Sequence, residues 1–267
     1  MKAVTLTGAA LAALLATTCA WSQTSTAQAL AELRGYALLI RTGQFDLAPK
    51  AMSLVETLLK AEPNNPEVLN AYAIANFNVL AASSQKGIDM AVAMPALQKG
   101  SAAFEKAAAL APDNADALAG RGASRTLMGS FSNNQELIAK GVADMNRAVE
   151  LAPNSPVPRL QRAFFGVNMP AGLRPDAGVE ADLKQLIAWG TPREKDVLNL
   201  LLGDLYAETG KLDLAKTHYE ASNRAGSTKA DLAQQRLTAV AKGRVGPAEI
   251  QSLRSQLGSN CVMCHAN

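Results

Sequence analysis

The stretch that decides the fold lies near the end of the chain and reads Leu202-Gly-Asp-Leu-Tyr-Ala-Glu-Thr-Gly-Lys-Leu-Asp-Leu-Ala-Lys-Thr-His-Tyr-Glu-Ala-Ser222. The small residue Gly203 lets two helices approach closely, and Tyr206 fills the space between them. Gly210 turns the chain. Ala215 and Tyr219, four positions apart, form the packed face of the second helix. The stretch therefore predicts a helical hairpin.

Similar helices recur earlier in the chain, and each is followed by a proline. Three segments can be aligned so that their apolar residues coincide at intervals of three or four, which places those residues on one helix face. The aligned residues are Val55 and Leu58 in segment 51–65, Phe104, Ala107 and Leu110 in segment 99–114, and Met145, Ala148 and Leu151 in segment 140–155. Proline cannot continue a helix, so each helix is expected to end just before Pro63, Pro112 or Pro153.

The C-terminal hairpin resembles the tetratricopeptide repeat, and Thr42–Ala48 resembles the turn of the same repeat near the start of the body. The likeness is strict only around residues 199–226. Elsewhere the spacing exceeds the family's repeat of about 34 residues. The excess falls in 83–94 and 129–134, which we expect to be loops or helix extensions. The resemblance implies an all-α, right-handed solenoid of helical hairpins over residues 28–242, with four to five helix pairs.

The composition also favours helices. Apolar residues make up 48% of the chain, but aromatic residues only 4%. A β-sandwich would need more Val, Ile, Thr and Tyr. Segments 168–176 and 242–247 are rich in helix breakers, and we expect them to be loops. The predicted helices are 28–42, 46–61, 66–82, 96–110, 115–129, 134–151, 156–166, 176–189, 193–209, 212–225, 228–242 and 247–257.

The last predicted helix belongs to a separate C-terminal unit, residues 243–267. Pro247 fits the first turn of this helix. Ile250, Leu253 and Leu257 lie on one of its faces. We expect that face to cap the solenoid and to place the following residues against it.

Those residues include Cys261-Val-Met-Cys264-His265, which has the Cys-x-x-Cys-His spacing of a c-type haem attachment site. Two thiols three positions apart can each form a thioether to one vinyl group of the porphyrin, and the next residue is a standard axial ligand of haem iron. The chain has only three Cys and two His, which makes a chance match improbable. This haem motif predicts covalent haem c, with Cys261 and Cys264 as attachment residues and His265 as proximal iron ligand.

Three other interpretations of the haem motif are open. Cys261 and Cys264 can form a disulfide beside an uninvolved His265. A structural zinc site requires four ligands, of which the motif supplies three. Thiol–disulfide exchange uses the same Cys-x-x-Cys spacing, but its usual βαβ context is missing from this sequence.

The ending 257–265 resembles class II c-type cytochromes, which carry the same motif after a helix close to the C-terminus. The resemblance implies the same attachment chemistry. Only Ala266 and Asn267 follow His265, so the helix that normally continues past the histidine is almost absent. The repeats of the body also differ from the single four-helix bundle of those cytochromes.

The sequence leaves the distal haem ligand open. His218 is a possible distal ligand, and the alternative is an exposed histidine on the second helix of the last hairpin. Methionine is also a possible ligand, although methionines are more often core fillers. The upstream methionines are Met90, Met94, Met128, Met145 and Met169. Five-coordinate iron is the third possibility.

The N-terminus has the order of a secretory signal peptide. Lys2 is followed by an apolar run and then by small residues. The run is too short to span a membrane. We expect residues 1–22 to be removed after Ala20 or Ser22 and the mature protein to be periplasmic, where c-type haem is attached. Lipidation of Cys19 is the alternative, and it is the only route by which we expect the protein to bind a membrane.

Two pairs of arginines form a second candidate site. They are Arg121 and Arg125, at i,i+4 on one predicted helix, and Arg159 and Arg162, at i,i+3 on the first helix of the next pair. Stacked repeats bring such helices side by side on a concave wall, so four guanidinium groups would suit carboxylates of a protein partner or the haem propionates. The alternative is that they pair within the protein with carboxylates such as Asp116, Asp144 or Asp176.

The net charge of +3 is small and not concentrated, so we expect no nucleic-acid partner. The sequence has no phosphate-binding loop, metalloprotease helix or nucleophile motif, and catalysis is not the favoured interpretation. We interpret the chain as an exported haem protein with an electron-transfer or redox role, whose concave repeat surface docks a protein partner. The alternative function is a periplasmic scaffold without a cofactor.

Overall fold

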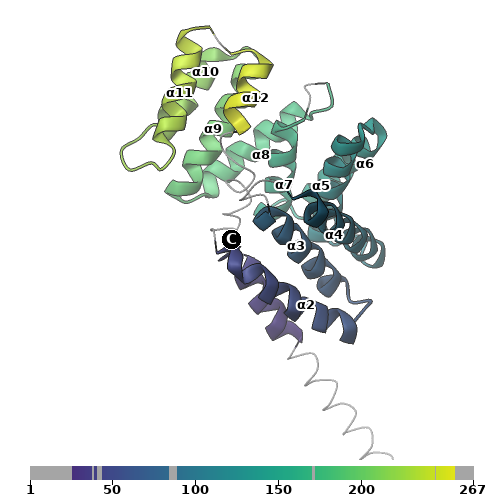
Figure 1. Ribbon diagram of the computed structural model, residues 1–267. Coiled ribbons are helices and arrows are strands. Elements are labelled where there is room, and N and C mark those ends of the chain that lie inside the picture. The colour runs from purple at the N-terminus through teal and green to yellow at the C-terminus, as the bar shows by residue number, and fades with distance from the viewer. Residues whose placement is uncertain are drawn as a thin grey trace, which may run out of the picture.

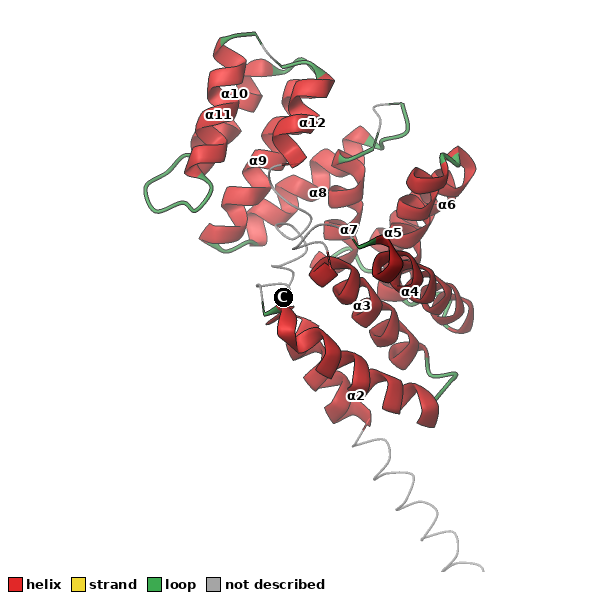
Figure 2. Ribbon diagram, viewed as in Figure 1, coloured by secondary structure: helices red, strands yellow, loops and turns green. Residues whose placement is uncertain are grey.

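The structure is a computed structural model that describes residues 26–37, 39–40, 44–83, 89–169, 172–243 and 245–255. These residues form an all-α protein without strands (Figure 2). The expected signal peptide and the haem motif both lie outside the described residues. Among the described residues, no helix combines the length and the apolar content needed to cross a bilayer.

The chain is a succession of helices with short connections (Figure 1). Residues 26–37 and 39–40 are helical and are called the first helix below. The following elements are η1 (Phe45–Leu47), α2 (Ala48–Ala61), α3 (Pro66–Ser83), α4 (Met90–Leu110), α5 (Ala115–Ser132), α6 (Gln135–Leu151), α7 (Pro156–Val167), α8 (Asp176–Trp189), α9 (Pro192–Glu208), α10 (Leu212–Ser222), α11 (Ala230–Ala241) and α12 (Pro247–Ser255).

Local signals set most helix ends. Helices α2, α4 and α6 end at Ala61, Leu110 and Leu151. Each end lies two residues before the proline that was expected to stop the helix. At the other ends, the Asn114 and Asn134 side chains accept backbone N–H bonds from the first turns of α5 and α6. The predicted helix bounds are therefore confirmed to within a few residues at most positions.

Two predicted bounds need correction. Helix α4 begins at Met90, six residues before the predicted start, because the Asp89 side chain caps it and Pro95 is accommodated inside the helix. Helix α5 runs three residues past its predicted end at 129, so the helix extension, one of the two options for 129–134, is confirmed for Gly129–Ser132. Asn133 then ends that helix in the left-handed conformation, at φ 51°.

The helices pack as a solenoid of hairpins (Figure 1). Within the described residues, α3 packs on α4, α5 on α6, α7 on α8 and α9 on α10. Short connections make the two helices of each hairpin antiparallel. The first members of successive hairpins also touch, since α3 contacts α5, α5 contacts α7 and α7 contacts α9. These helices form a continuous inner layer, and α4, α6, α8 and α10 lie outside it.

The hairpin of α9 and α10 has the packing that its sequence predicts. A Cβ on Gly203 would lie 2.5 Å from Cε1 of Tyr219, so the two helices pack closely because this residue has no side chain. Tyr206, Ala215 and Tyr219 are all buried. Gly210 has φ +75°, a left-handed turn conformation that glycine adopts without strain.

The predicted apolar faces are mostly buried. Phe104, Ala107, Met145 and Ala148 are at most 6% exposed. Leu110, which was expected on the same face, is 48% exposed at the end of α4. Leu110 is the last residue of this helix.

The C-terminal helix α12 caps the array as predicted. Ile250 and Leu253 are buried in the same apolar core as Leu201 and Leu205 of α9. Leu257, the third residue of the predicted face, lies outside the described residues. The face that α12 presents to the solenoid is therefore its apolar one.

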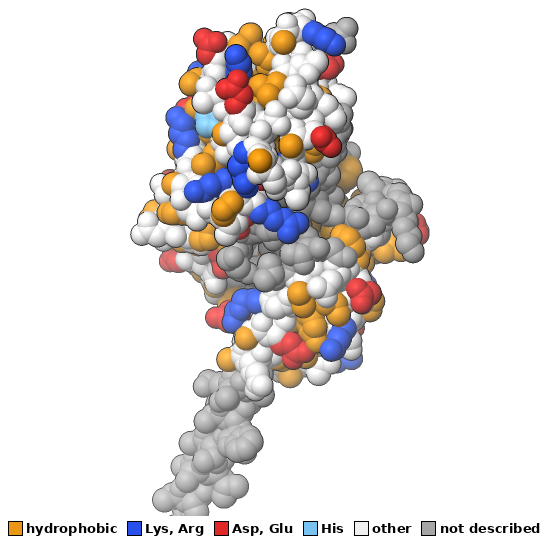
Figure 3. Space-filling model, turned by 90° about the vertical axis from the view of Figure 1, so that its left-hand side faces the viewer, with side chains coloured by type: hydrophobic (Ala, Val, Ile, Leu, Met, Phe, Trp, Pro, Cys, Tyr) orange, Lys and Arg blue, Asp and Glu red, His pale blue; other side chains and the backbone are white. Residues whose placement is uncertain are grey.

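Charged side chains are mixed on the surface. On the face in Figure 3, Lys and Arg side chains are interspersed with Asp and Glu, and no large patch of one sign is visible there. A mixed surface creates little long-range field on that face.

Replacing Gly203 by Ala is expected to destabilise the protein by about 1–2 kcal/mol. The new methyl group would overlap the buried Tyr219 ring, and this cost exceeds the roughly 1 kcal/mol that Ala gains over Gly in a helix. Gly35→Ala is the matched control, because a Cβ at Gly35 meets nothing within 4 Å. That control is expected to stabilise the first helix by about 0.5–1 kcal/mol. Urea unfolding of both variants tests the prediction, and equal stabilities would contradict it.

Candidate functional site

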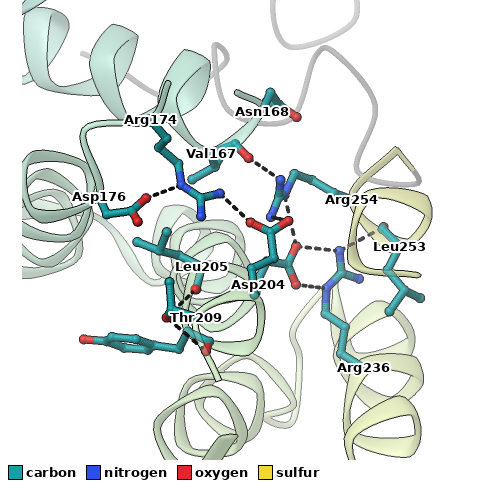
Figure 4. A network of polar contacts seen from close by, with 12 residues as sticks. Val167, Asn168, Arg174, Asp176, Asp204, Leu205, Thr209, Arg236, Leu253 and Arg254 are labelled. Carbon is teal, nitrogen blue, oxygen red and sulfur yellow. Dashed lines mark hydrogen bonds and ion pairs between the residues drawn. The ribbon is translucent and has the colours of Figure 1, made fainter. Parts of the chain in front are cut away.

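The part of the structure closest to the haem motif in sequence is the end of α12. Cys261 follows Ser255, the last residue of α12, by six positions. Whatever fixes α12 therefore fixes where the C-terminal segment begins. The helix is held by a network of buried ion pairs (Figure 4), which we call the anchor network. Its members are Arg174, Asp176, Asp204, Glu208, Tyr219, Arg236 and Arg254.

Asp204 of α9 is the centre of the anchor network, and its side chain is fully buried. Arg236 of α11, also fully buried, donates from Nε to Asp204 Oδ1 at 2.8 Å and from Nη2 to Oδ2 at 3.1 Å. The Tyr219 hydroxyl donates to Asp204 Oδ1 at 2.9 Å. Burial raises the pKa of Tyr219, and the neighbouring Asp204 charge raises it further. Tyr219 is therefore a neutral donor to the carboxylate.

Arg236 also reaches α12 directly. Its Nη2 donates to the carbonyl oxygen of Leu253 at 2.9 Å (Figure 4). The last carbonyls of a helix have no partner inside the helix, so this guanidinium supplies a missing donor. One side chain thus joins α9, α11 and the last turn of α12.

Arg254 ties the same turn of α12 to two other elements. Its Nη2 donates to Glu208 Oε1 at 2.9 Å, and its Nη1 donates to the carbonyl oxygen of Val167 at the end of α7. Arg254 Nε lies 3.6 Å from Asp204 Oδ2, an ion pair without a hydrogen bond. The end of α12 is therefore held against both α9 and α7.

Arg174 completes the network from the loop before α8. It donates from Nη1 to Glu208 and from Nε to Asp176, and only 2% of its side chain is exposed. Glu208 thus lies between the guanidinium groups of Arg174 and Arg254. Three arginines and three carboxylates alternate, so the buried charges compensate one another.

The sequence interpretation missed the anchor network. Asp204 stands inside the apolar run 197–206, on the buried face of its helix. A carboxylate in that position needs a buried cation, which is a signal that Arg236 or Arg254 has to pack against it. The sequence does not show which arginine does so, because the partners are 32 and 50 positions away.

The predicted arginine site forms ion pairs within the protein. Arg121 donates to both oxygens of Asp144, at 2.8 and 2.6 Å, and Arg125 bonds both Asp144 and Glu105. The hydrogen bond to Asp144 raises the pKa of Arg121. These contacts join α5 to α6 and α4.

The second arginine pair behaves in the same way. Arg159 donates to Asp182 at 2.7 Å, and Arg162 donates to both oxygens of Asp182, which is fully buried. Among the carboxylates expected as alternative partners of these arginines, Asp144 pairs with Arg121. Asp176 pairs instead with Arg174. All four arginines have internal partners, and their role in binding a protein partner stays a prediction.

His218 is half-buried in α10, so the alternative of an exposed histidine is only partly met. Asn199 donates through Nδ2 to the Lys195 carbonyl, which leaves its Oδ1 to accept from His218 Nδ1 at 2.8 Å. The proton therefore resides on Nδ1, and Nε2 keeps the lone pair that a metal would need. The imidazole also lies 5.5 Å from the Tyr206 ring.

The candidate methionine ligands are partly accounted for. Met145 and Met169 are 0% and 7% exposed and pack in one apolar cluster with Ile138. Met94 and Met128 are half-buried. The side chain of Met90 lies outside the description. Core filling explains Met145 and Met169, which leaves His218 and the other methionines as open candidates for the distal position.

No group of three or more His, Cys, Asp or Glu in the described part of the chain is arranged to hold a metal ion. No protein-family model matches the chain, and no curated protein matches its sequence. The functional proposal therefore depends on the residues themselves.

Asp204→Ala is expected to lower the free energy of unfolding by about 3–5 kcal/mol, because it leaves the buried Arg236 charge without its carboxylate. The matched control is Glu136→Ala, which removes an exposed pair with Lys140 and should cost far less, because solvent screens that pair. Urea unfolding measures both, and amide hydrogen exchange of residues 247–255 reports whether α12 is released. A loss for Asp204→Ala as small as that of the control would contradict the anchoring role.

His218 is expected to make stability depend on pH. Burial lowers its pKa below the ordinary value of 6.5, and the Lys184 charge lowers it further, while Glu180 opposes the shift. A lowered folded-state pKa means that protonation favours the unfolded chain. The contribution of His218 is therefore complete above about pH 6.5 and is lost as the pH falls towards the folded-state pKa.

The test compares the native protein with His218→Gln by urea unfolding at about pH 7.5 and about pH 5.5. The native protein should lose more stability between the two pH values than the variant does. Equal losses would show that His218 is not titrated in this range.

Proposed function

We propose that the protein is an exported c-type haem protein with an electron-transfer or redox role, whose helical solenoid docks a protein partner. The observation that carries the proposal is the haem motif in the sequence, placed directly after an ion-paired helix. The signal-peptide pattern of residues 1–22 supports it, because c-type haem is attached outside the cytoplasm.

The residues of the haem motif suit haem attachment. Cys261 and Cys264 would form the two thioethers, and His265 would bind the iron. Haem bound in this way supplies reversible one-electron chemistry. The anchor network acts on the polypeptide: it holds the last turn of α12 through Arg236 and Arg254, so that the attachment residues start from a fixed point on the solenoid.

The solenoid supplies the second half of the proposal. Arrays of helical hairpins typically bind proteins or peptides on their inner surface. The inner layer of this protein, from the first helix to α9, offers such a surface. Ion pairs already engage Arg121, Arg125, Arg159 and Arg162, so other groups of the inner layer are better placed to meet a partner.

The alternative function is a periplasmic scaffold without haem, in which Cys261 and Cys264 form a disulfide. The same inner surface supports it, because a scaffold needs no cofactor to bind a partner. The two functions differ in the chemical state of the two sulfur atoms.

The exported protein from a host that attaches c-type haem is expected to be pink and to carry the mass of one haem. Replacing both Cys261 and Cys264 by Ser should give a colourless protein, because both thioethers are lost, and His265→Ala should abolish the normal reduced c-type spectrum. Cys19→Ser is the matched control, since its thiol lies in the segment expected to leave on export. It should keep the native spectrum.

Thiol labelling separates the two functions. Thioethers at Cys261 and Cys264 resist both reductant and alkylating reagent, whereas a disulfide becomes reactive after reduction. A colourless protein of unmodified mass, with two thiols that react after reduction, would refute the haem proposal and support the scaffold.

A further inference from the structure

The inner layer contains a cavity of about 310 Å³ between the first helix, α3, α5 and α7. We call it the inner groove. Apolar side chains such as Leu33 and Ile74 line it beside the amides of Asn70, Asn78 and Gln161. A second cavity of about 30 Å³ shares Ile74, Asn78 and Gln161 and extends to Phe165 of α7. The volume of the inner groove lies at the lower end of the range of small-molecule and peptide sites.

Two polar atoms of the inner groove have no partner in the protein. The amide oxygens of Asn70 and Gln161 are buried and accept no hydrogen bond from any described residue. Buried polar atoms are almost always paired, so these two acceptors indicate a missing donor. Backbone N–H groups of an extended peptide are donors of the right kind.

Asp116 lies at the mouth of the inner groove. Its side chain is accessible to water, but the surrounding concave wall desolvates it and raises the pKa of the carboxyl. The charged side chains that line the groove are Arg34, Glu67 and Asp116. They carry no excess of positive charge, so the groove suits an uncharged peptide better than an acidic one.

The end of α12 lies close to this groove. Arg254 is bonded to the carbonyl of Val167, the last residue of α7, and Gln161 stands six residues earlier on the same helix. Six residues of α-helix span about 9 Å. Phe165, which lines the second cavity, is only two residues from Val167. The chain after Ser255 thus starts beside the inner groove.

The segment after Ser255 also has suitable length and chemistry. Residues 256–267 number twelve, and twelve extended residues span up to about 40 Å. Adjacent helices lie about 8–10 Å apart, so this length is enough to cross from α7 to the first helix. The segment contains no Asp, Glu, Lys or Arg and has an apolar residue at Leu257.

We propose that residues 256–267 occupy the inner groove of their own chain, with backbone N–H groups donating to the amide oxygens of Asn70 and Gln161. Covalent connection favours this occupant over a separate molecule, because a short tether gives an effective concentration on the order of mM. A protein partner that binds the inner groove then has to displace the C-terminal segment. This seating goes beyond the haem proposal and does not depend on it.

Photo-crosslinking tests the seating in the full-length exported protein. Ile74→p-benzoyl-L-phenylalanine places a crosslinker in the inner groove, and Glu67→p-benzoyl-L-phenylalanine places one at its exposed mouth, where folding is not at risk. Leu110→p-benzoyl-L-phenylalanine is the matched control, because Leu110 is exposed on α4 and does not line the groove. Circular dichroism checks that each variant is folded.

The proposal expects peptides from 256–267 to be joined to positions 67 and 74 within one chain, and not to position 110. Crosslinks from positions 67 and 74 that join two chains would show that a second copy fills the groove. Crosslinks from those positions only to neighbouring helices would show that the groove is free of the tail. Either result overturns the proposal.

Haem is scored separately, by its mass on the same peptides. A crosslinked tail without haem leaves the seating intact and refutes the haem function. If residues 256–267 carry haem but form no crosslinks to positions 67 and 74, the haem function is supported and the seating is refuted.

Discussion

The buried charge of Asp204 is the constraint on which the C-terminal third of the protein depends. A carboxylate removed from water destabilises the fold unless cations and hydrogen-bond donors surround it. Arg236, Arg254 and Tyr219 supply them from three different helices. The apolar packing of α12 alone would allow several orientations on α9, because Ile250 and Leu253 offer only a small apolar face. The directed guanidinium contacts select one orientation.

The same solution appears twice more in the solenoid. Asp144 of α6 is bonded by two arginines of α5, and Asp182 of α8 is bonded by two arginines of α7. In both cases the carboxylate is on the outer helix of a hairpin and the arginines are on the inner helix. Each pair of arginines therefore fixes how its two helices lie together. Because these four arginines are engaged in ion pairs, the inner groove is lined by amides such as Asn70, Asn78 and Gln161 together with Arg34, Glu67 and Asp116.

The sequence predicted what local chemistry determines. Prolines set the helix ends, and the close approach of two helices at Gly203 could be inferred within a single hairpin. The errors have local and non-local causes. The start of α4 was misplaced because a proline inside a helix looks like a helix boundary. The anchor network was missed because its partners are separated by many residues, and only the folded chain brings Asp204, Arg236 and Arg254 together. For the haem motif, the prediction depends on residue spacing alone.

The contact between Arg254 and Val167 changes how the end of the chain relates to the array. In repeat proteins each unit normally contacts only its neighbours, so a terminal helix should extend the array outward. Here α12 packs on α9, and its last turn is bonded to α7, 87 residues earlier. After α10 and α11 the chain therefore turns back towards α9 and α7, instead of leaving the end of the solenoid. Because of this return, the segment that carries Cys261, Cys264 and His265 begins beside the inner layer, where a partner would also bind. In the proposal that residues 256–267 occupy the inner groove, their position and partner binding are linked by geometry, whichever chemical state the two cysteines have.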